Sequence, residues 1–287
     1  SPNIARHFIY QDKGVILGHM AMVRFYEDAW LIHHHAARRH ALNKAGLVVL
    51  DQIGRFSYDA YRLFSMHMNY LICYYRPDNK FPSRVFGGLA AHINNSRGCS
   101  LDPFAFLKVD NPKGHPPQLP PDWKLSPSTL VDLEELTDFY DQTSGGLALR
   151  ALDLEAGVWN SNALSVEYRS HGFTREKHHF SLIHDGCLLA FFIVTVSDIG
   201  LNLSDLTNCI KVIILDQEAL PPERLYEALA AIRAKLNQPA MPVLLYPVSY
   251  ADSRSIPYTK QYILWTLRTH GQSDKYFQYL NRLLRIS

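Results

Sequence analysis

The chain has 287 residues, of which 47% are hydrophobic and 20% charged, and its formal net charge at pH 7 is +2. A chain of this length accommodates two domains of about 100–150 residues each. Basic residues are dispersed among acidic ones, so the strongly basic surface typical of nucleic-acid binding is not expected. Composition therefore favours a globular protein without a nucleic-acid partner.

The longest apolar run, residues 187–196, is about half the roughly 20 residues that a membrane-spanning helix needs, so we expect no membrane association. The cysteines lack CxxC spacing, which is typical of reduced thiols in the cytoplasm rather than of a zinc site or a disulfide framework. Two of them, Cys73 and Cys187, lie in apolar runs and are expected to be buried. The other two are Cys99 and Cys209.

The first part of the chain reads as a hairpin, a strand, a helix, a strand and a helix. The hairpin turns at Asp12-Lys13-Gly14, and a further strand begins at 29–34. Apolar residues then recur at three- and four-residue steps, which predicts a helix. Those residues are Leu42, Ala45, Val49, Ile53 and Phe56. Aromatic and β-branched residues predict a strand at 68–75, and a helix is expected at 81–94.

A proline-rich segment, 110–128, separates this part from a second series of elements. Ser126-Pro127 predicts the start of a helix, and a helical stretch follows at 162–171. Asp185-Gly186 between two apolar runs indicates a hairpin. The remaining expected elements are a strand at 208–215, a helix from Pro221-Pro222, a strand at 242–248, a helix at 256–269 and a short amphipathic piece at 276–286.

The order of elements is alike on both sides of the proline-rich segment, so two copies of one unit explain it. We expect a first unit at 1–109, a linker at 110–128 and a second unit at 129–287. The chain begins SPNIARHF, without a starting Met, and the first unit lacks opening helices. Further domains of the same polypeptide are therefore expected.

This order resembles the GNAT (N-acetyltransferase) fold, which has a long hairpin, a fourth strand, a central helix, a fifth strand and a further helix. The matching stretches are VILGHMAMVRFY to NYLICYYRPDNKFPSRVFGGL in the first unit and FSLIHDGCLLAFFIVTV to VLLYPVSYADSRSIPYTKQYILW in the second. The resemblance implies an α/β (α+β) protein with two GNAT-like units, each a mixed, mostly antiparallel sheet flanked by helices. Asn79, just past the fifth strand, resembles an asparagine often found there in the family.

The loop that binds the coenzyme A pyrophosphate in this family reads roughly Gln/Arg-x-x-Gly-x-Gly/Ala, and both units depart from it. The first unit has HHHAARRHALNK and the second has DQEALPPERLYE at that position. Glycines there let consecutive N–H groups face an anion at a helix N-terminus. Pro221 and Pro222 lack N–H groups, and Asp216 and Glu218 repel anions. The second loop is therefore not expected to bind coenzyme A in the usual way.

The first loop carries Arg38 and Arg39 near the start of a helix, where cations oppose the helix dipole. A bound anion would reverse that penalty. The sequence thus predicts a phosphate or carboxylate pocket at Arg38 and Arg39, and the resemblance implies Asn79 as a further cofactor-binding residue. The alternative is a solvated basic turn. The cofactor that the resemblance implies is acetyl-CoA or another acyl-CoA.

The histidines at the end of the fourth strand are candidates for a catalytic base, because imidazole titrates near neutral pH. On a regular strand His33 and His35 share one face. Packed or surface histidines remain the alternative. No metal site is expected, because zinc needs three or four converging ligands and His7 and His19 could approach only through tertiary folding.

Three further residues come from the resemblance and from turn chemistry. In the family a tyrosine on the last helix can protonate the departing thiolate, which implies this role for Tyr258, although a tyrosine at helical spacing is more often core. Glu27 and Asp28 lie in a turn, where solvated carboxylates are normal.

Three functions stay open. The first is an acyltransferase that moves an acyl group from acyl-CoA to a small-molecule or peptide amine. The second is a transferase that uses an aminoacyl-tRNA donor, as do tandem relatives without a pyrophosphate loop. The third is a catalytically silent GNAT-like pair that senses an anionic ligand or docks a partner within a larger protein.

Overall fold

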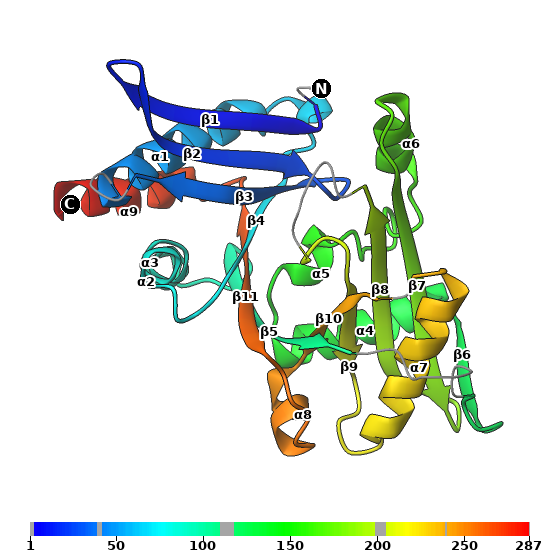
Figure 1. Cartoon of the computed structure of the whole chain (residues 1–287). Helices are drawn as coiled ribbons and strands as arrows, with labels where there is room; N and C mark the ends of the chain where they lie inside the picture. Colours follow the sequence, from blue (N-terminus) through cyan, green and yellow to red (C-terminus); the bar gives the residue numbers. More distant parts are fainter. Residues whose placement is uncertain (1–2, 39–41, 110–117, 199–204, 239, 287) are drawn as a thin grey trace. The chain divides into compact units, whose positions relative to one another are not determined.

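The structure is a computed structural model that describes residues 3–38, 42–109, 118–198, 205–238 and 240–286 (Figure 1). The chain divides into two compact units, and neither is contiguous in sequence. Unit 1 comprises Ser1–Asp102, Ser144–Leu164 and Ile263–Ser287, and unit 2 comprises Pro103–Thr143 and Ser165–Tyr262. Each unit is a mixed, mostly antiparallel sheet with flanking helices, which confirms the expected fold class.

In unit 1 the strands lie in the order β1-β2-β3-β4-β11. Their bounds are Ala5–Asp12, Val15–Arg24, Ala29–Ala37, Tyr70–Tyr75 and Lys260–Arg268. The β1–β2 hairpin turns at Lys13-Gly14, and both residues have positive φ, as a tight two-residue turn requires. The predicted first hairpin and the strands at 29–34 and 68–75 are thus confirmed.

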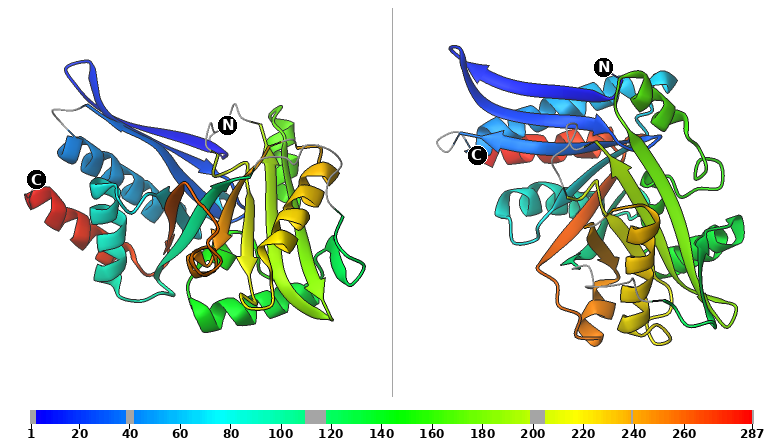
Figure 2. Two further views of the ribbon diagram at one scale, coloured as in Figure 1. Left: turned by 60° about the horizontal axis from the view of Figure 1, so that its bottom comes forward. Right: turned by 45° about the vertical axis from the view of Figure 1, so that its right-hand side comes forward.

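Two long helices, α1 (Leu42–Ala60) and α9 (Ser273–Ile286), pack together against the sheet of unit 1 (Figure 2). Their apolar faces share one core with side chains of β2, β3 and β4. The helix expected at 81–94 is a continuous helical run of α2 (Lys80–Pro82), a π turn η3 (Ser83–Gly87) and α3 (Gly88–Ile93). Shorter elements of this unit are η2 (Phe64–Met66) and α5 (Ala148–Ala151).

In unit 2 the strands lie in the order β5-β10-β9-β8-β7-β6. Their bounds, in the same order, are Cys99–Lys108, Pro242–Tyr246, Ile210–Ile214, Cys187–Ser197, Arg175–His184 and Trp123–Pro127. The helices that belong to it wholly or largely are α4 (Leu130–Thr143), α6 (Ala163–Ser170), α7 (Pro222–Lys235) and α8 (Val248–Ser253). The hairpin at Asp185-Gly186 and the helix from Pro221-Pro222 are confirmed.

The boundary between the units differs from the expected contiguous division. Strand β11 pairs antiparallel with β4, from Ile263 opposite Tyr75 to Arg268 opposite Tyr70, so the C-terminal segment belongs to unit 1. Conversely, β5 begins in unit 1, and its C-terminal end pairs antiparallel with β10 of unit 2. Local sequence patterns do not specify such pairing, because the partners are far apart in the chain.

The expected linker, 110–128, is partly a strand. Residues 110–117 lie outside the described residues, but 123–127 form β6, which pairs antiparallel with β7. Strand β6 ends the strand order of unit 2, and an edge strand tolerates proline because one side of it needs no ladder hydrogen bonds. Ser126 and Pro127 therefore belong to a strand, and α4 begins later. There Thr129 and Asp132 hydrogen-bond reciprocally, side chain to backbone N–H.

The prediction of a helix at 256–269 is wrong, because residues Lys260–Arg268 form strand β11. Every side chain from Leu264 to Leu267 is buried, as in a strand covered on both faces. A continuous apolar run has no period that separates a buried strand from a buried helix, which explains the error. The expected burial of Cys73 is confirmed, whereas Cys187 is exposed because it lies at the hairpin end of β8.

Candidate functional site

Strands β3 and β4 of unit 1 run parallel, pair briefly and then separate. Within the described residues their register covers only Ala29–Leu31 opposite Tyr70–Ile72, although β3 continues to Ala37 and β4 to Tyr75. The divergence is visible where the two ribbons part toward α2 (Figure 1). Beyond this point the facing backbone edges do not pair with each other, and backbone N–H and C=O groups require some partner. The two strands thus share a ladder over only part of their length, and we call the unpaired part the gap between β3 and β4.

A β-bulge interrupts β3 in this separated part. Against β2, His33 lies opposite Ala21 and Ala36 lies opposite His19, so three steps along β3 match two along β2. A bulge reverses the alternation of side chains beyond it. His33 and His35 therefore point to opposite faces of the sheet, contrary to the expectation that they share one. The two candidate bases cannot act together on one ligand atom.

His35 lies against two helices of unit 1. Its ring stacks on Phe81 of α2, with the ring centroids 4.9 Å apart and the planes inclined by 10°. Gly46 of α1 touches the same pair: a methyl group there would lie 2.8 Å from His35 Nε2 and 2.8 Å from Phe81. Burial lowers the pKa of His35 below its usual value, even though part of the residue remains exposed. The imidazole is thus neutral at pH 7 and can accept a proton.

The predicted anion-binding residues lie around the same gap, as far as the structure describes them. Arg38 directly follows β3, is exposed, and donates its backbone N–H to the carbonyl of Leu17 at 3.0 Å. Arg39 lies outside the described residues. Asn79 precedes α2, and its carbonyl accepts the N–H of Ser83. Arg38 and Asn79 thus follow the two separating strands.

Tyr258 is not on a helix. It lies between α8 and β11 in unit 2, where its hydroxyl donates to Asp252 Oδ1 at 3.1 Å. That hydrogen bond, with smaller effects from burial and from the charge of Asp252, raises the pKa of Tyr258. The resemblance implied a thiolate-protonating tyrosine on the family's last helix, but in this chain the segment expected to form that helix contains strand β11. The secondary structure therefore does not support this role for Tyr258.

The equivalent strands of unit 2 stay together. Strands β9 and β10 pair in parallel along four positions, from Ile210 opposite Val243 to Ile213 opposite Tyr246, which is nearly their whole length. Every residue of β9 is buried. The parallel pairing in unit 2 thus extends along nearly the whole of both strands, whereas that of β3 and β4 covers only part of them.

A buried polar cluster near the β2–β3 turn was missed by sequence reasoning. Glu27 is only 6% exposed, and its Oε1 accepts hydrogen bonds from Ser161 Oγ at 2.8 Å and Leu164 N at 3.1 Å. Its backbone N–H donates to Asp153 Oδ1 at 2.8 Å, and Arg24 forms an ion pair with it at 3.7 Å. These contacts hold the segment Ser144–Leu164 in unit 1. Glu27 is thus a structural carboxylate and not the solvated turn residue that was expected.

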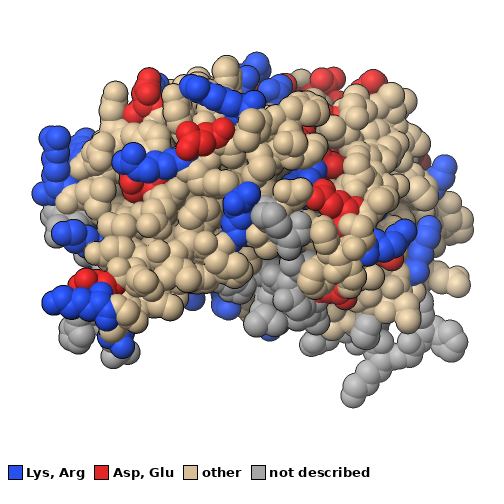
Figure 3. All heavy atoms as spheres, turned by 90° about the horizontal axis from the view of Figure 1, so that it is seen from above, with Lys and Arg blue, Asp and Glu red and all other residues tan. Residues whose placement is uncertain are grey.

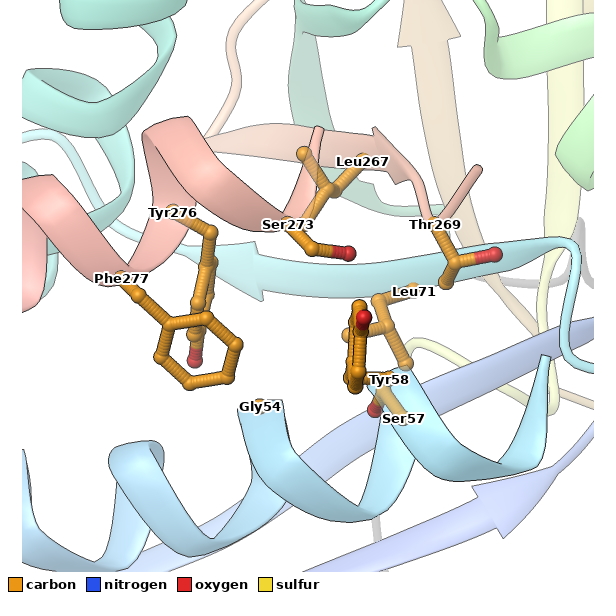
Figure 4. Close-up of a pocket in the computed structure, with 9 residues that line it drawn as sticks. All are labelled: Gly54, Ser57, Tyr58, Leu71, Leu267, Thr269, Ser273, Tyr276 and Phe277. Carbon is orange, nitrogen blue, oxygen red and sulfur yellow. The ribbon is translucent and has the colours of Figure 1, made fainter. Parts of the chain in front are cut away.

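One pocket of unit 1 lies between α1, α9 and the ends of β4 and β11 (Figure 4). Its volume of about 20 Å³ has room for roughly one water molecule, which excludes a coenzyme. The polar groups around it are engaged: Tyr276 donates to the carbonyl of Leu50 at 2.8 Å, and Ser57 donates to that of Ile53 at 2.8 Å. This pocket is a packing defect and not a ligand site.

Basic and acidic side chains are interspersed over the face seen in Figure 3. Among the described residues, no group of three or more His, Cys, Asp or Glu side chains converges on one point. Within the same part of the chain, every helix is too short or too polar to cross a lipid bilayer.

No protein-family model and no curated protein matches the chain. Several solved structures are similar to the chain. A tandem GNAT protein from the clavulanic acid biosynthesis pathway is 10% identical to it, with a TM-score of 0.42, and the match covers 92% of this chain and 83% of that protein. A GCN5-related N-acetyltransferase from Kribbella flavida is 14% identical, with a TM-score of 0.42 over 94% and 92%. A Drosophila protein is 12% identical, with a TM-score of 0.50 over 92% and 81%.

Two of these solved structures carry names of the GNAT superfamily, and membership of this chain in that superfamily stays the prediction that the order of elements makes. At 10–14% identity such a likeness concerns the fold alone and leaves substrate and reaction open.

Proposed function

We propose that unit 1 is an acyltransferase site that moves an acyl group from an acyl-CoA thioester to an amine. The observation that carries the proposal is the separation of β3 from β4, with a β-bulge in the freed part of β3. Unit 2 keeps its equivalent strands paired, so the proposed site is single.

The residues present fit an acyl-CoA in two respects. The amide groups of its pantetheine arm can pair with the backbone edges that β3 and β4 leave facing each other, as an added strand does. Its phosphates would lie near Arg38, an exposed cation directly after β3. Asn79, which follows β4 and precedes α2, would supply a further polar contact.

The chemistry requires a donor that polarises the thioester carbonyl and a base that takes the amine proton. A bulge leaves a backbone N–H out of the regular ladder, and such an N–H can donate to a developing oxyanion. His35, whose lowered pKa keeps it neutral at pH 7, is the preferred base, and His33 is the alternative on the other face. The thioester, when bound, supplies a thiolate leaving group. A role for Tyr258 stays a prediction, as do the acceptor amine and a cytoplasmic location.

The test is calorimetric titration of wild type and Arg38→Ala with CoA and acetyl-CoA. Arg97→Ala is the matched control, because Arg97 is also an exposed arginine of unit 1 and its recorded hydrogen bond uses only its backbone N–H. We expect binding by wild type and the control, and weaker binding by Arg38→Ala. Absence of binding up to millimolar ligand would refute the proposal.

One observation favours a silent ligand-sensing module as the second candidate. The His35–Phe81 stack touches Gly46, so side chains bridge α1 and α2 beside the separated strands. A ligand that enters between these helices must displace the stack. If Phe81→Ala binds coenzyme A but transfers no acyl group to any amine offered, the sensing function is the better account.

A further inference from the structure

The fold brings two histidines together that the sequence places twelve residues apart. His7 of β1 and His19 of β2 are diagonal neighbours, since His19 lies opposite Ile9 and His7 lies opposite Ala21. Their strand neighbours Phe8 and Met20 pack into the core of unit 1. Because side chains alternate along a strand, the two imidazoles project from the other face. His7 is exposed and His19 is partly exposed.

The geometry of this pair is close. His7 Nδ1 and His19 Nε2 are 3.0 Å apart, and the rings stack with centroids separated by 5.3 Å and planes inclined by 24°. In the neutral pair, one ring donates its N–H to the bare nitrogen of the other. A nitrogen from each ring therefore already faces the other at hydrogen-bond distance.

We propose that His7 and His19 form a two-histidine site for a divalent transition-metal ion. Imidazole nitrogens bind such ions at about 2.0–2.1 Å, and angles of about 90–109° at the metal place the two nitrogens about 2.9–3.3 Å apart. The observed 3.0 Å falls within that range. When the metal binds, the donor ring carries its proton on its other nitrogen instead, so that both facing nitrogens present lone pairs. The ring torsions that aim these lone pairs at the metal are soft and face solvent.

The donor set selects the class of ion. Imidazole suits Cu²⁺, Ni²⁺ and Zn²⁺, whereas Mg²⁺ and Ca²⁺ prefer oxygen ligands. Because no third His, Cys, Asp or Glu converges here within the described residues, water completes the coordination. The ion is thus exchangeable and has open positions. The bound ion would link β1 to β2, and β1 is the edge strand of the unit 1 sheet.

The binding experiment uses Ni²⁺ in calorimetry with protein that has first been stripped by a chelator. A second ligand on the same chain binds intramolecularly, so the pair should exceed a single histidine by about 10²-fold in affinity. We expect one Ni²⁺ site that His7→Gln and His19→Gln each weaken at least about tenfold. His171→Gln, which removes an exposed histidine of another segment, should leave this site unchanged.

Two more readouts keep the test independent of any single variant. Ni²⁺ should raise the melting temperature of wild type but not of His7→Gln, because a ligand of the native state stabilises it. Cu²⁺ electron paramagnetic resonance should show coupling to two imidazole nitrogens that falls to one in either variant. The proposal is overturned if wild type and the double variant bind Ni²⁺ equally, or if the pair keeps its hydrogen bond and binds no metal. Neither result depends on acyl transfer.

Discussion

Acid should destabilise unit 2 through His179 of β7. The ring packs near Phe191, and its Nε2 is out of contact with solvent. Burial, assisted by the nearby charges of Lys177, His178 and Arg175, lowers the pKa of His179 from 6.5 to about 3. Between pH 6.5 and about pH 3 the unfolded chain therefore binds a proton at this histidine that the native protein does not bind. The free energy of unfolding thus falls by about 1.4 kcal/mol for each unit by which the pH is lowered.

From these values the loss is about 2 kcal/mol between pH 7 and pH 5, and about 4 kcal/mol between pH 7 and pH 3. The variant His179→Gln does not titrate and should abolish this part of the decline. Urea denaturation at pH 7, 6 and 5 measures it, with His171→Gln as the control for an exposed histidine. If His179→Gln and His171→Gln lose stability equally between pH 7 and pH 5, the assignment of His179 is refuted.

Four further outcomes are expected. Gly88→Ala should lower the free energy of unfolding, measured by urea denaturation, by about 1–3 kcal/mol. The new methyl group would collide with the hydroxyl of Tyr279, a residue of α9 that hydrogen-bonds to the carbonyl of Arg84. An unchanged urea midpoint would contradict this contact. Glu27→Ala should lower the free energy of unfolding by about 3–5 kcal/mol, because it removes the carboxylate that pairs with the buried guanidinium of Arg24. Glu27→Gln should lower it by less. Burial raises the pKa of the Cys73 thiol from 9 to about 12. Between these pH values the unfolded chain loses the thiol proton more readily than the native protein, so the free energy of unfolding should fall as the pH rises. Cys73→Val should show a smaller decrease over the same pH range. Phe81→Ala, which removes the ring stacked on His35, should bind acetyl-CoA more tightly than wild type in calorimetry; equal affinity would show that the stack does not obstruct the site.

Local elements were predictable because their signals are local. Asp185-Gly186 adopts the positive φ angles of a tight turn, and Pro221-Pro222 begins α7, as the residue types require. The candidate site was predicted only in outline. His33 and His35 lie on β3, Arg38 directly follows it, and Asn79 lies between β4 and α2, but nothing in their spacing indicated the bulge.

The sequence by itself determined the two hairpins, most of the individual helices and strands, and the missing glycine loop, since each depends on residues near one another in the chain. Only the tertiary structure decided that β11 and α9 join unit 1, that Glu27 is buried, and that His7 meets His19. Strand partners, bulges and buried ion pairs are chosen by hydrogen bonds and packing between distant residues. A pattern of period two or 3.6 carries no information about which distant residue becomes the neighbour.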